Sequence, residues 1–271
     1  MERDRIGQPG KMALVARDDT VIGLGNNVMQ SLGGRLLKRL DLTAVALVEP
    51  PFPFSDHLIT TTPTAETRIT PRDTETRTFL HDIPILRASQ LTGDPADQIA
   101  ELLGQRKGVL IEGIGIIATG SITVEQAYIN VSSLFHSLLV KYLHDLLIRS
   151  EIPKRELQQL DGFRRHWLIT PDKPPGLLPG QALTEPSTIL QEMCKVGRIT
   201  VKLGLVDSFF GNISCRYDNM LYISQTAASL DELEGCIDPV PFDNSSTCGI
   251  TASSELLAHR LIYEQTGART L

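Results

Sequence analysis

The residue types best suited to chemistry gather in two short stretches of the second half. "GNIS" (211–214) interrupts two apolar segments, and "TASSELLAH" (251–259) sets two serines before a carboxylate. Glycine and asparagine tolerate positive φ, and a helix start leaves backbone N–H groups that attract an anion. The pattern predicts an anion-binding rim, although a bend entering a strand and an ordinary helix N-terminus would use the same residues.

A third stretch, "SQTAAS" (224–229), lies between these two and is also rich in small hydroxyl side chains. Ser224 and Thr226 could add hydroxyl donors to the same rim. The stretch is equally typical of a turn that caps the next segment, "LDELEG". The signal is weak in each stretch alone, and the order of the three is what makes it specific.

The first half must supply most of the scaffold, and its apolar spacing predicts alternating strands and helices. The predicted strands are 12–16, 20–25, 42–49, 83–86 and a pair within 108–120. The predicted helices are 27–40, 95–105 and 123–149, the last with Thr123 and Gln126 as a capping box. Residues 56–78 are rich in threonine and arginine, which predicts a long loop or an irregular strand.

The second half opens with a proline-rich segment, 170–186, which its composition predicts to be a linker. A helix over 187–205, a hairpin around "GNIS", a polar loop over 231–250 and a helix from Ser253 to about Gln265 follow. Two strong strands are too few for a stable sheet. We therefore expect one composite α/β domain over residues 1–271.

Composition narrows the classes of partner. The chain has a net charge of −6 and is 41% hydrophobic, which is ordinary for a globular protein. No basic stripe predicts nucleic-acid binding. No apolar run reaches the ~18 residues of a membrane span, and the charged start lacks the apolar core of a signal peptide. We expect a cytoplasmic protein whose partner is a small anionic metabolite.

In their order, the three stretches resemble the N-terminal half of class II aldolase/adducin domains, where "(S)GNIS", "ITP(S/T)G" and "SSE" follow a helix. The resemblance implies a three-layer α/β/α fold with a mainly antiparallel central sheet. It also implies that Glu255 is a general acid/base. The residues that it implies hold a phosphate or an equivalent anion are Gly211, Asn212, Ser224, Thr226, Ser253 and Ser254. Gln225 and Ala227 depart from the proline and glycine usual in the second turn.

The first half resembles the other half of the same family. "DLTAVALVEPPF" (41–52) is similar to "DVGAVVHTHSPY", and 108–128 is similar to "AVLLRNHGVVVWGRDLEEAF". The halves stand in reversed order, which implies a circular permutation. Residues 1–150 would be the family's C-terminal half, 150–186 a linker, and 187–271 its N-terminal half.

The family's metal ligands are absent from the corresponding positions. The resemblance implies three histidines that bind a divalent metal, usually zinc, but these positions hold Leu47, Glu49 and Ile114. The six histidines of the chain match no metal signature. One alternative is a carboxylate site for Mg²⁺ or Mn²⁺, in which Glu49 and Glu112 join Glu255 if Glu112 shares a strand face with Ile114.

Three functions stay open at this point. The first is a protein that binds a phosphorylated or carboxylated, sugar-like ligand, with its aldol-lyase activity altered or lost. The second is an active aldolase, epimerase or decarboxylase, with or without a metal, that uses Glu255 as acid/base. The third is a non-catalytic module that acts through oligomer contacts. The resemblance implies a homo-oligomer, since cyclic tetramers are common in the family.

Overall fold

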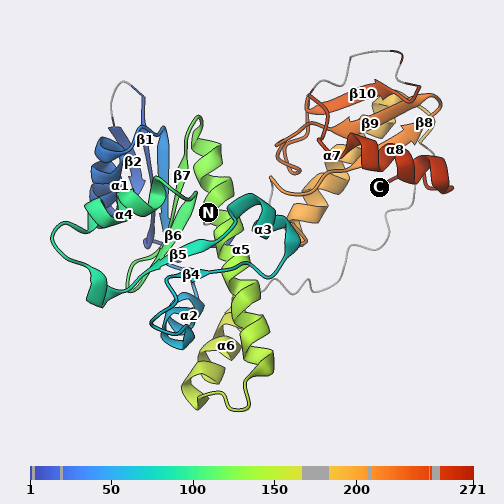
Figure 1. Ribbon diagram of the computed structural model, residues 1–271. Helices are drawn as coiled ribbons and strands as arrows, with labels where there is room; N and C mark the ends of the chain where they lie inside the picture. The colour runs from blue at the N-terminus through green and yellow to red at the C-terminus, as the bar shows by residue number, and fades with distance from the viewer. Residues whose placement is uncertain (2–3, 19–20, 167–182, 207–208, 244, 246–250) are drawn as a thin grey trace. The chain divides into compact units, whose positions relative to one another are not determined.

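The computed structural model describes residues 1–271 except 2–3, 19–20, 167–182, 207–208, 244 and 246–250. The chain divides into two compact units, Met1–Leu168 and Ile169–Leu271, and each is described here by itself (Figure 1). Most of the segment predicted to be a linker, 170–186, lies outside the described residues. The single composite domain stays a prediction.

The first unit is built on a seven-stranded sheet with the order β2-β1-β3-β7-β6-β5-β4. Neighbouring strands are antiparallel except for β5 and β6, which are parallel. The strands are β1 (Met12–Arg17), β2 (Val21–Gly25), β3 (Ala44–Val48), β4 (Arg68–Ile69), β5 (Ile83–Leu86), β6 (Gly108–Ile111) and β7 (Gly115–Gly120). The predicted strands of the first half are thus confirmed.

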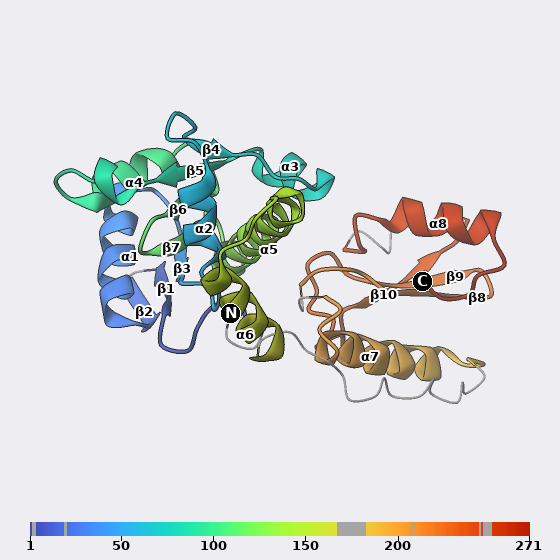
Figure 2. The same ribbon diagram turned by 90° about the horizontal axis from the view of Figure 1, so that it is seen from below.

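Helices cover both faces of this sheet, as Figure 2 shows. Residues alternate across β3, so Val45 and Leu47 pack on one side with α1 and α4, while Ala46 and Val48 pack on the other with α2 and α5. The helices are α1 (Asn27–Arg39), α2 (Phe54–Thr61), α3 (Thr74–Leu80), α4 (Pro95–Leu103), α5 (Val124–Ile148) and α6 (Lys154–His166), with a short 3₁₀ helix, η1 (Ala88–Gln90). The capping box of Thr123 and Gln126 is present.

Two segments of this unit differ from the sequence prediction. Residues 56–78 contain most of α2 and α3 with β4 between them. Helix α2 buries Phe54, Leu58 and Ile59 on one face, a spacing that the threonines obscured. The hydroxyls of Thr60 and Thr61 bond to carbonyls four residues earlier in the helix. The start of the segment 150–186 forms α6, which buries Phe163 in the core.

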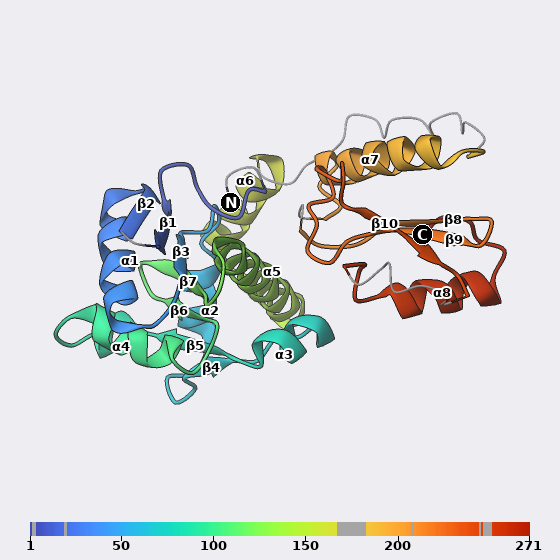
Figure 3. The same cartoon turned by 90° about the horizontal axis from the view of Figure 1, so that it is seen from above.

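The second unit is a three-stranded antiparallel sheet with the order β10-β9-β8 between two helices (Figure 3). Its elements are α7 (Pro186–Lys202), β8 (Ser214–Tyr217), β9 (Met220–Ser224), β10 (Ile237–Pro241) and α8 (Leu256–Gln265). Leu221 and Ile223 pack with Tyr263 of α8, whereas Tyr222 packs with Ile189 of α7. The alternation places one helix on each face of the sheet.

The polar loop predicted over 231–250 is wrong where β10 forms. Its prolines, Pro239 and Pro241, argue against a central strand, but β10 is the last strand in the order, where proline is tolerated. At the other end of the sheet the chain end extends it: the N–H of Ser214 donates to the carbonyl of Leu271 at 2.9 Å, and that of Arg216 donates to the carbonyl of Arg269 at 2.8 Å.

The α/β class with a mainly antiparallel sheet flanked by helices is thus confirmed for both units. Within the described part of the chain, no helix combines the length and the apolar character needed to cross a membrane.

Candidate functional site

The three sequence stretches meet in the second unit. The N–H of Ser224 donates to the carbonyl of Ile213, and the N–H of Ser253 donates to the carbonyl of Ser224, both at 3.0 Å. The end of β9 is therefore held between the residues that enter β8 and those that precede α8. All six predicted anion-binding residues and Glu255 belong to these three segments.

Gly211 makes the turn that leads into β8. Its φ is +78°, a conformation that residues with a side chain rarely adopt. A Cβ atom there would lie 3.4 Å from the side chain of Val206 and 3.6 Å from that of Leu230. The backbone conformation, more than lack of space, requires glycine at this position.

Asn212 and Glu255 contact each other directly. Nδ2 of Asn212 donates to Oε2 of Glu255. Glu255 is the N-cap residue of α8, and its own side chain makes no capping bond. Its carboxylate therefore lies beside the positive end of the helix dipole, is exposed to solvent, and is oriented by the amide of Asn212.

Two of the four predicted hydroxyls, those of Ser224 and Thr226, tie the three segments together, and that of Ser253 bonds within its own segment. Oγ of Ser224 accepts from the N–H of Ile213 at 3.2 Å, Oγ1 of Thr226 donates to the carbonyl of Ala252 at 2.8 Å, and Oγ of Ser253 accepts from the N–H of Glu255 at 3.3 Å. Ser254 is exposed next to Glu255. These bonds shape the rim, and its binding of an anion stays a prediction.

The two departures in the second turn are accommodated differently. The N–H of Ala228 donates to the carbonyl of Gln225 at 3.1 Å, which closes a turn in which Ala227 has φ of +59°. The side chain of Gln225 donates to Asp238 at 2.8 Å, and the other oxygen of Asp238 accepts from Thr251 at 2.6 Å. Asp238 thus braces the turn against the segment that precedes α8.

A buried network behind Asn212 escaped the sequence analysis. Nε2 of His259 contacts Oδ1 of Asn212. Nδ1 of His259 lies 2.7 Å from Oγ of Ser214, which lies 2.8 Å from the hydroxyl of Tyr263. His259 is 7% exposed, Ser214 2% and Tyr263 1%. Burial lowers the pKa of His259, against the opposing effect of Glu255, and burial raises the pKa of Tyr263.

One sequence signal could have revealed this network. Glu255, His259 and Tyr263 are spaced four residues apart, which places them on one side of a helix. This spacing is overlooked when the six histidines are considered only as possible metal ligands. Ser214 carries no signal of its own, because its partners are 45 and 49 residues away in the sequence.

The three positions that the sequence resemblance assigns to metal ligands, Leu47, Glu49 and Ile114, lie in the first unit, and their surroundings do not fit a metal. Leu47 is 0% exposed within the core, and Ile114 packs against the same core. The carboxylate of Glu49 pairs with Nζ of Lys11 at 2.6 Å. In the described part of the chain, no group of three His, Cys, Asp or Glu side chains is arranged to hold a metal ion.

The strand geometry proposed for the carboxylate alternative is wrong. β6 ends at Ile111, and residues 112–114 form the turn that leads into β7, so Glu112 and Ile114 do not share a strand face. Gly113, with φ of +74°, lies in this turn, and Gly115, with φ of +110°, begins β7. Oε2 of Glu112 accepts from the N–H of Ala88 at 2.8 Å. Glu255 belongs to the other unit, and a carboxylate site stays untested.

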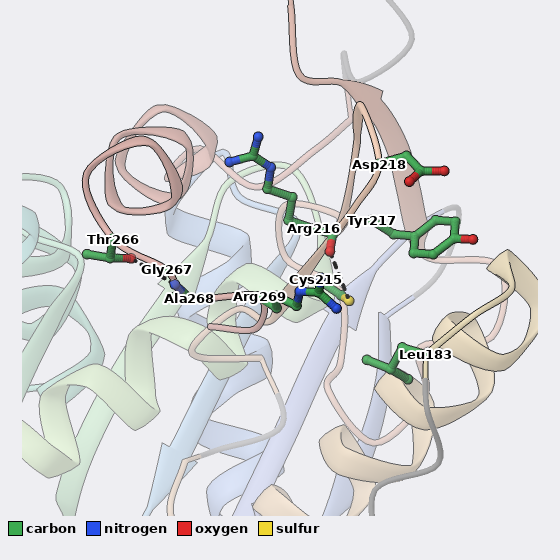
Figure 4. Close-up of a pocket in the computed structure, with 9 residues that line it drawn as sticks. All are labelled: Leu183, Cys215, Arg216, Tyr217, Asp218, Thr266, Gly267, Ala268 and Arg269. Atoms are coloured by element: carbon green, nitrogen blue, oxygen red, sulfur yellow. Dashed lines mark hydrogen bonds between the residues drawn. The ribbon is translucent and has the colours of Figure 1, made fainter.

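A separate hollow of about 400 Å³ lies in the second unit, between β8 and residues 266–269 (Figure 4). Arg269 and Cys215 line it, together with Asp218. None of the seven predicted site residues does. Burial raises the pKa of the Cys215 thiol, although Arg269 opposes the shift. The hollow is distinct from the rim around Glu255.

The second unit thus combines a small antiparallel sheet between two helices with a Gly-Asn bend that contacts the glutamate at the start of α8. The comparison with known families agrees: the sequence model of the class II aldolase and adducin N-terminal domain matches residues 191–270. That stretch of the chain belongs to the class II aldolase and adducin family. No curated protein matches the chain.

Solved structures also align with the chain at low identity. The L-fuculose-1-phosphate aldolase of Thermus thermophilus aligns at 16% identity and a TM-score of 0.46, over 55% of this chain and 90% of that one. An aldolase II superfamily protein from Pseudomonas syringae aligns at 12% identity and a TM-score of 0.42, over 73% of this chain and 86% of that one.

Proposed function

We propose that this protein binds a small phosphorylated or carboxylated, sugar-like metabolite at the rim around Asn212 and Glu255, and that its aldol-lyase activity is altered or lost. The convergence of the three family stretches on one rim is the observation that carries the proposal. The first turn of α8 supplies N–H groups and a favourable dipole for an anion. Ser254 adds an exposed hydroxyl.

The altered chemistry rests on the first unit. In the family, the metal polarises a carbonyl and stabilises an enediolate. Here, the positions that the resemblance assigns to the metal ligands hold Leu47 in the core, Ile114 packed against it, and Glu49 paired with a lysine. A neutral aliphatic side chain cannot ligate a cation, so these residues would not hold the family's metal. We therefore assign no step to it.

Ligand-dependent stability tests the binding. We expect a sugar phosphate such as glucose 6-phosphate to raise the unfolding temperature, since a ligand at 100 times its Kd stabilises by about 2.7 kcal/mol. Glucose should not. Ser254→Ala should weaken the effect, whereas Ser187→Ala, an exposed serine at the start of α7, should leave it unchanged. Equal responses to the sugar and its phosphate, or to the two variants, would contradict the proposal.

Elemental analysis tests the metal. We expect the protein, purified without chelator and incubated with zinc, manganese or magnesium, to retain well under one ion per chain after buffer exchange. About one ion per chain would contradict this and favour a carboxylate site. Glu49→Gln and Glu112→Gln would then show which carboxylate holds the ion.

A second candidate is an enzyme that uses Glu255 as a general acid/base. The contact with Asn212 favours it, because an oriented and solvent-accessible carboxylate can exchange protons with a bound substrate. Under this candidate, Glu255→Gln should keep the ligand-induced stabilisation and abolish turnover of sugar phosphates. No turnover by the unaltered protein, with or without added metal ions, would leave the binding function alone.

The same resemblance leads us to propose a homo-oligomer in the cytoplasm, for which a tetramer is the first state to test. Light scattering coupled to size-exclusion chromatography measures the mass directly, against 29.8 kDa for one chain. A mass of one chain at micromolar concentration would contradict this part of the proposal, and with it the oligomerising module as an alternative.

A further inference from the structure

The network behind Asn212 has one consistent arrangement of hydrogens. An ionised carboxylate can only accept, so Glu255 requires the NH₂ end of the Asn212 side chain. The carbonyl end, Oδ1, then faces Nε2 of His259. Because Oδ1 carries no hydrogen, Nε2 must be the donor of that pair.

The rest of the direction follows from the state of the ring. Burial lowers the pKa of His259, so the ring is neutral at neutral pH and carries one hydrogen, which Nε2 already holds. Nδ1 therefore accepts from the hydroxyl of Ser214 at 2.7 Å. Since the hydroxyl hydrogen of Ser214 is already used in that bond, its oxygen accepts from the hydroxyl of Tyr263 at 2.8 Å.

We infer that Tyr263, Ser214 and His259 are positioning residues, which fix the side-chain amide of Asn212 so that its NH₂ group faces the carboxylate of Glu255. Without the donor at His259, the amide could turn by half a rotation. Its oxygen would then face the carboxylate, and two acceptors would repel each other. This inference rests on the proposed function, because the orientation of the Asn212 amide matters for binding only if the rim binds an anion.

The spatial placement supports the role. His259 and Tyr263 follow Glu255 at intervals of four on α8, and Ser214 begins β8 two residues after Asn212. These three residues, called the relay from here on, thus link helix α8 to the strand that follows the Gly-Asn bend. All three side chains are at least nine-tenths buried, so solvent does not compete for their hydrogen bonds.

The relay can be tested in the full chain without any ligand. Nitrogen NMR of the histidine rings should show His259 neutral, with the hydrogen on Nε2. The side-chain NH₂ of Asn212 should be protected from exchange with water. Ser214→Ala and Tyr263→Phe should make that exchange about fivefold faster, the equivalent of one hydrogen bond of about 1 kcal/mol. Ser214→Thr, which keeps the hydroxyl, should restore the original rate.

The control is Tyr217→Phe. Tyr217 lies on the same strand, and its hydroxyl donates to the carbonyl of Thr184 outside the network, so its loss should leave the exchange of Asn212 unchanged. A hydrogen on Nδ1, a charged ring at neutral pH, or an Asn212 exchange rate insensitive to Ser214→Ala and Tyr263→Phe would overturn the inference. If one of these variants fails to fold, the other and the ring tautomer decide.

Binding of inorganic phosphate separates this inference from the proposed function. We expect Ser214→Ala to raise the Kd for phosphate about fivefold and Ser214→Thr to restore it. If the NMR signature is present but phosphate and sugar phosphates do not bind, the relay stands and the binding function fails. If they bind equally well to Ser214→Ala and to the unaltered protein, the binding function stands and the positioning role fails.

Discussion

Ala227 shows how a single residue can keep a turn that its type disfavours. Its φ of +59° lies in the left-handed region, which costs a residue with a Cβ roughly 1 kcal/mol. Bonds from both sides hold the turn: Gln225 bonds to Asp238, and Thr226 bonds to the carbonyl of Ala252. The departure from the family's glycine therefore leaves the rim intact at a cost in stability.

Ala227→Gly should accordingly stabilise the protein by about 0.5–1 kcal/mol, because glycine adopts this φ without strain. Denaturant unfolding measures the change. The matched control is Ala228→Gly, one residue on and outside the set of positive-φ positions, which should destabilise by loosening the unfolded chain. A loss of stability in both variants would contradict the strain at Ala227.

His259 gives the second unit a specific pH dependence. Its folded pKa is depressed by burial, so the unfolded chain binds its proton more readily. The stability that this residue contributes is present above its unfolded pKa of about 6.5 and is lost as pH falls through the lower folded value. We expect His259→Gln to reduce the loss of unfolding free energy below about pH 6.5. Parallel pH profiles for the two proteins would show that the ring does not stay neutral.

Residue types predicted part of the rim and missed its support. Gly211 and Asn212 were predicted because turns use a small set of residues with known geometry, whereas the role of Glu255 was implied by the resemblance to the family. Ser214 and Tyr263 were missed because a serine in a strand and a tyrosine in a helix look ordinary. Only the tertiary fold brings Ser214 between His259 and Tyr263.

At the scale of elements, α7 must lie close to the loop that follows the second turn. A Cβ on Gly197 would lie 2.0 Å from the carbonyl oxygen of Leu230, and backbone cannot move aside cheaply. Gly197→Ala should therefore destabilise the second unit by about 2 kcal/mol or more, although alanine favours helices. Thermal unfolding followed by circular dichroism measures it.

Gly162 on α6 is the matched control, since a Cβ there meets nothing within 4 Å. Gly162→Ala should stabilise by about 1 kcal/mol through helix propensity alone. Opposite signs for the two glycine-to-alanine changes are the expected result. Stabilisation in both would mean that α7 is not in close contact with the carbonyl of Leu230.

Elements with strong apolar periodicity were predictable, and those whose polar composition hid it were not. The strands of the first sheet other than β4, and helices α1, α4, α5 and α7, followed from spacing. Helix α2 was missed because threonines surround its apolar face, and β10 because prolines signal a loop. In both cases burial on one face decided the structure against local preference.

For the whole molecule, the open question is whether the two units depend on each other. The second has a sheet of three named strands and small clusters of buried residues, which is close to the minimum for independent stability. The prediction of one composite domain requires that a fragment of residues 169–271 unfold at lower denaturant concentration than the same unit in the full chain. Amide resonances of β9, followed in both, measure this.

An unchanged midpoint would instead make the units two autonomous domains. The apolar pattern of the sequence could not decide between these outcomes. It predicts which side chains of a segment are buried, but not which other segment buries them. The reversed order of the family's halves could be proposed from motif order alone. Whether they associate as in an unpermuted relative depends on contacts that the sequence pattern does not specify.

The pairing of Leu271 with Ser214 has a practical consequence for anyone preparing this protein. The backbone of Ser214 both donates to Leu271 and accepts from it, at 2.9 and 3.1 Å. An affinity handle fused after residue 271 would pull on the strand that carries the buried serine of the relay. Recombinant material for the experiments above is better tagged before Met1, which belongs to the other unit.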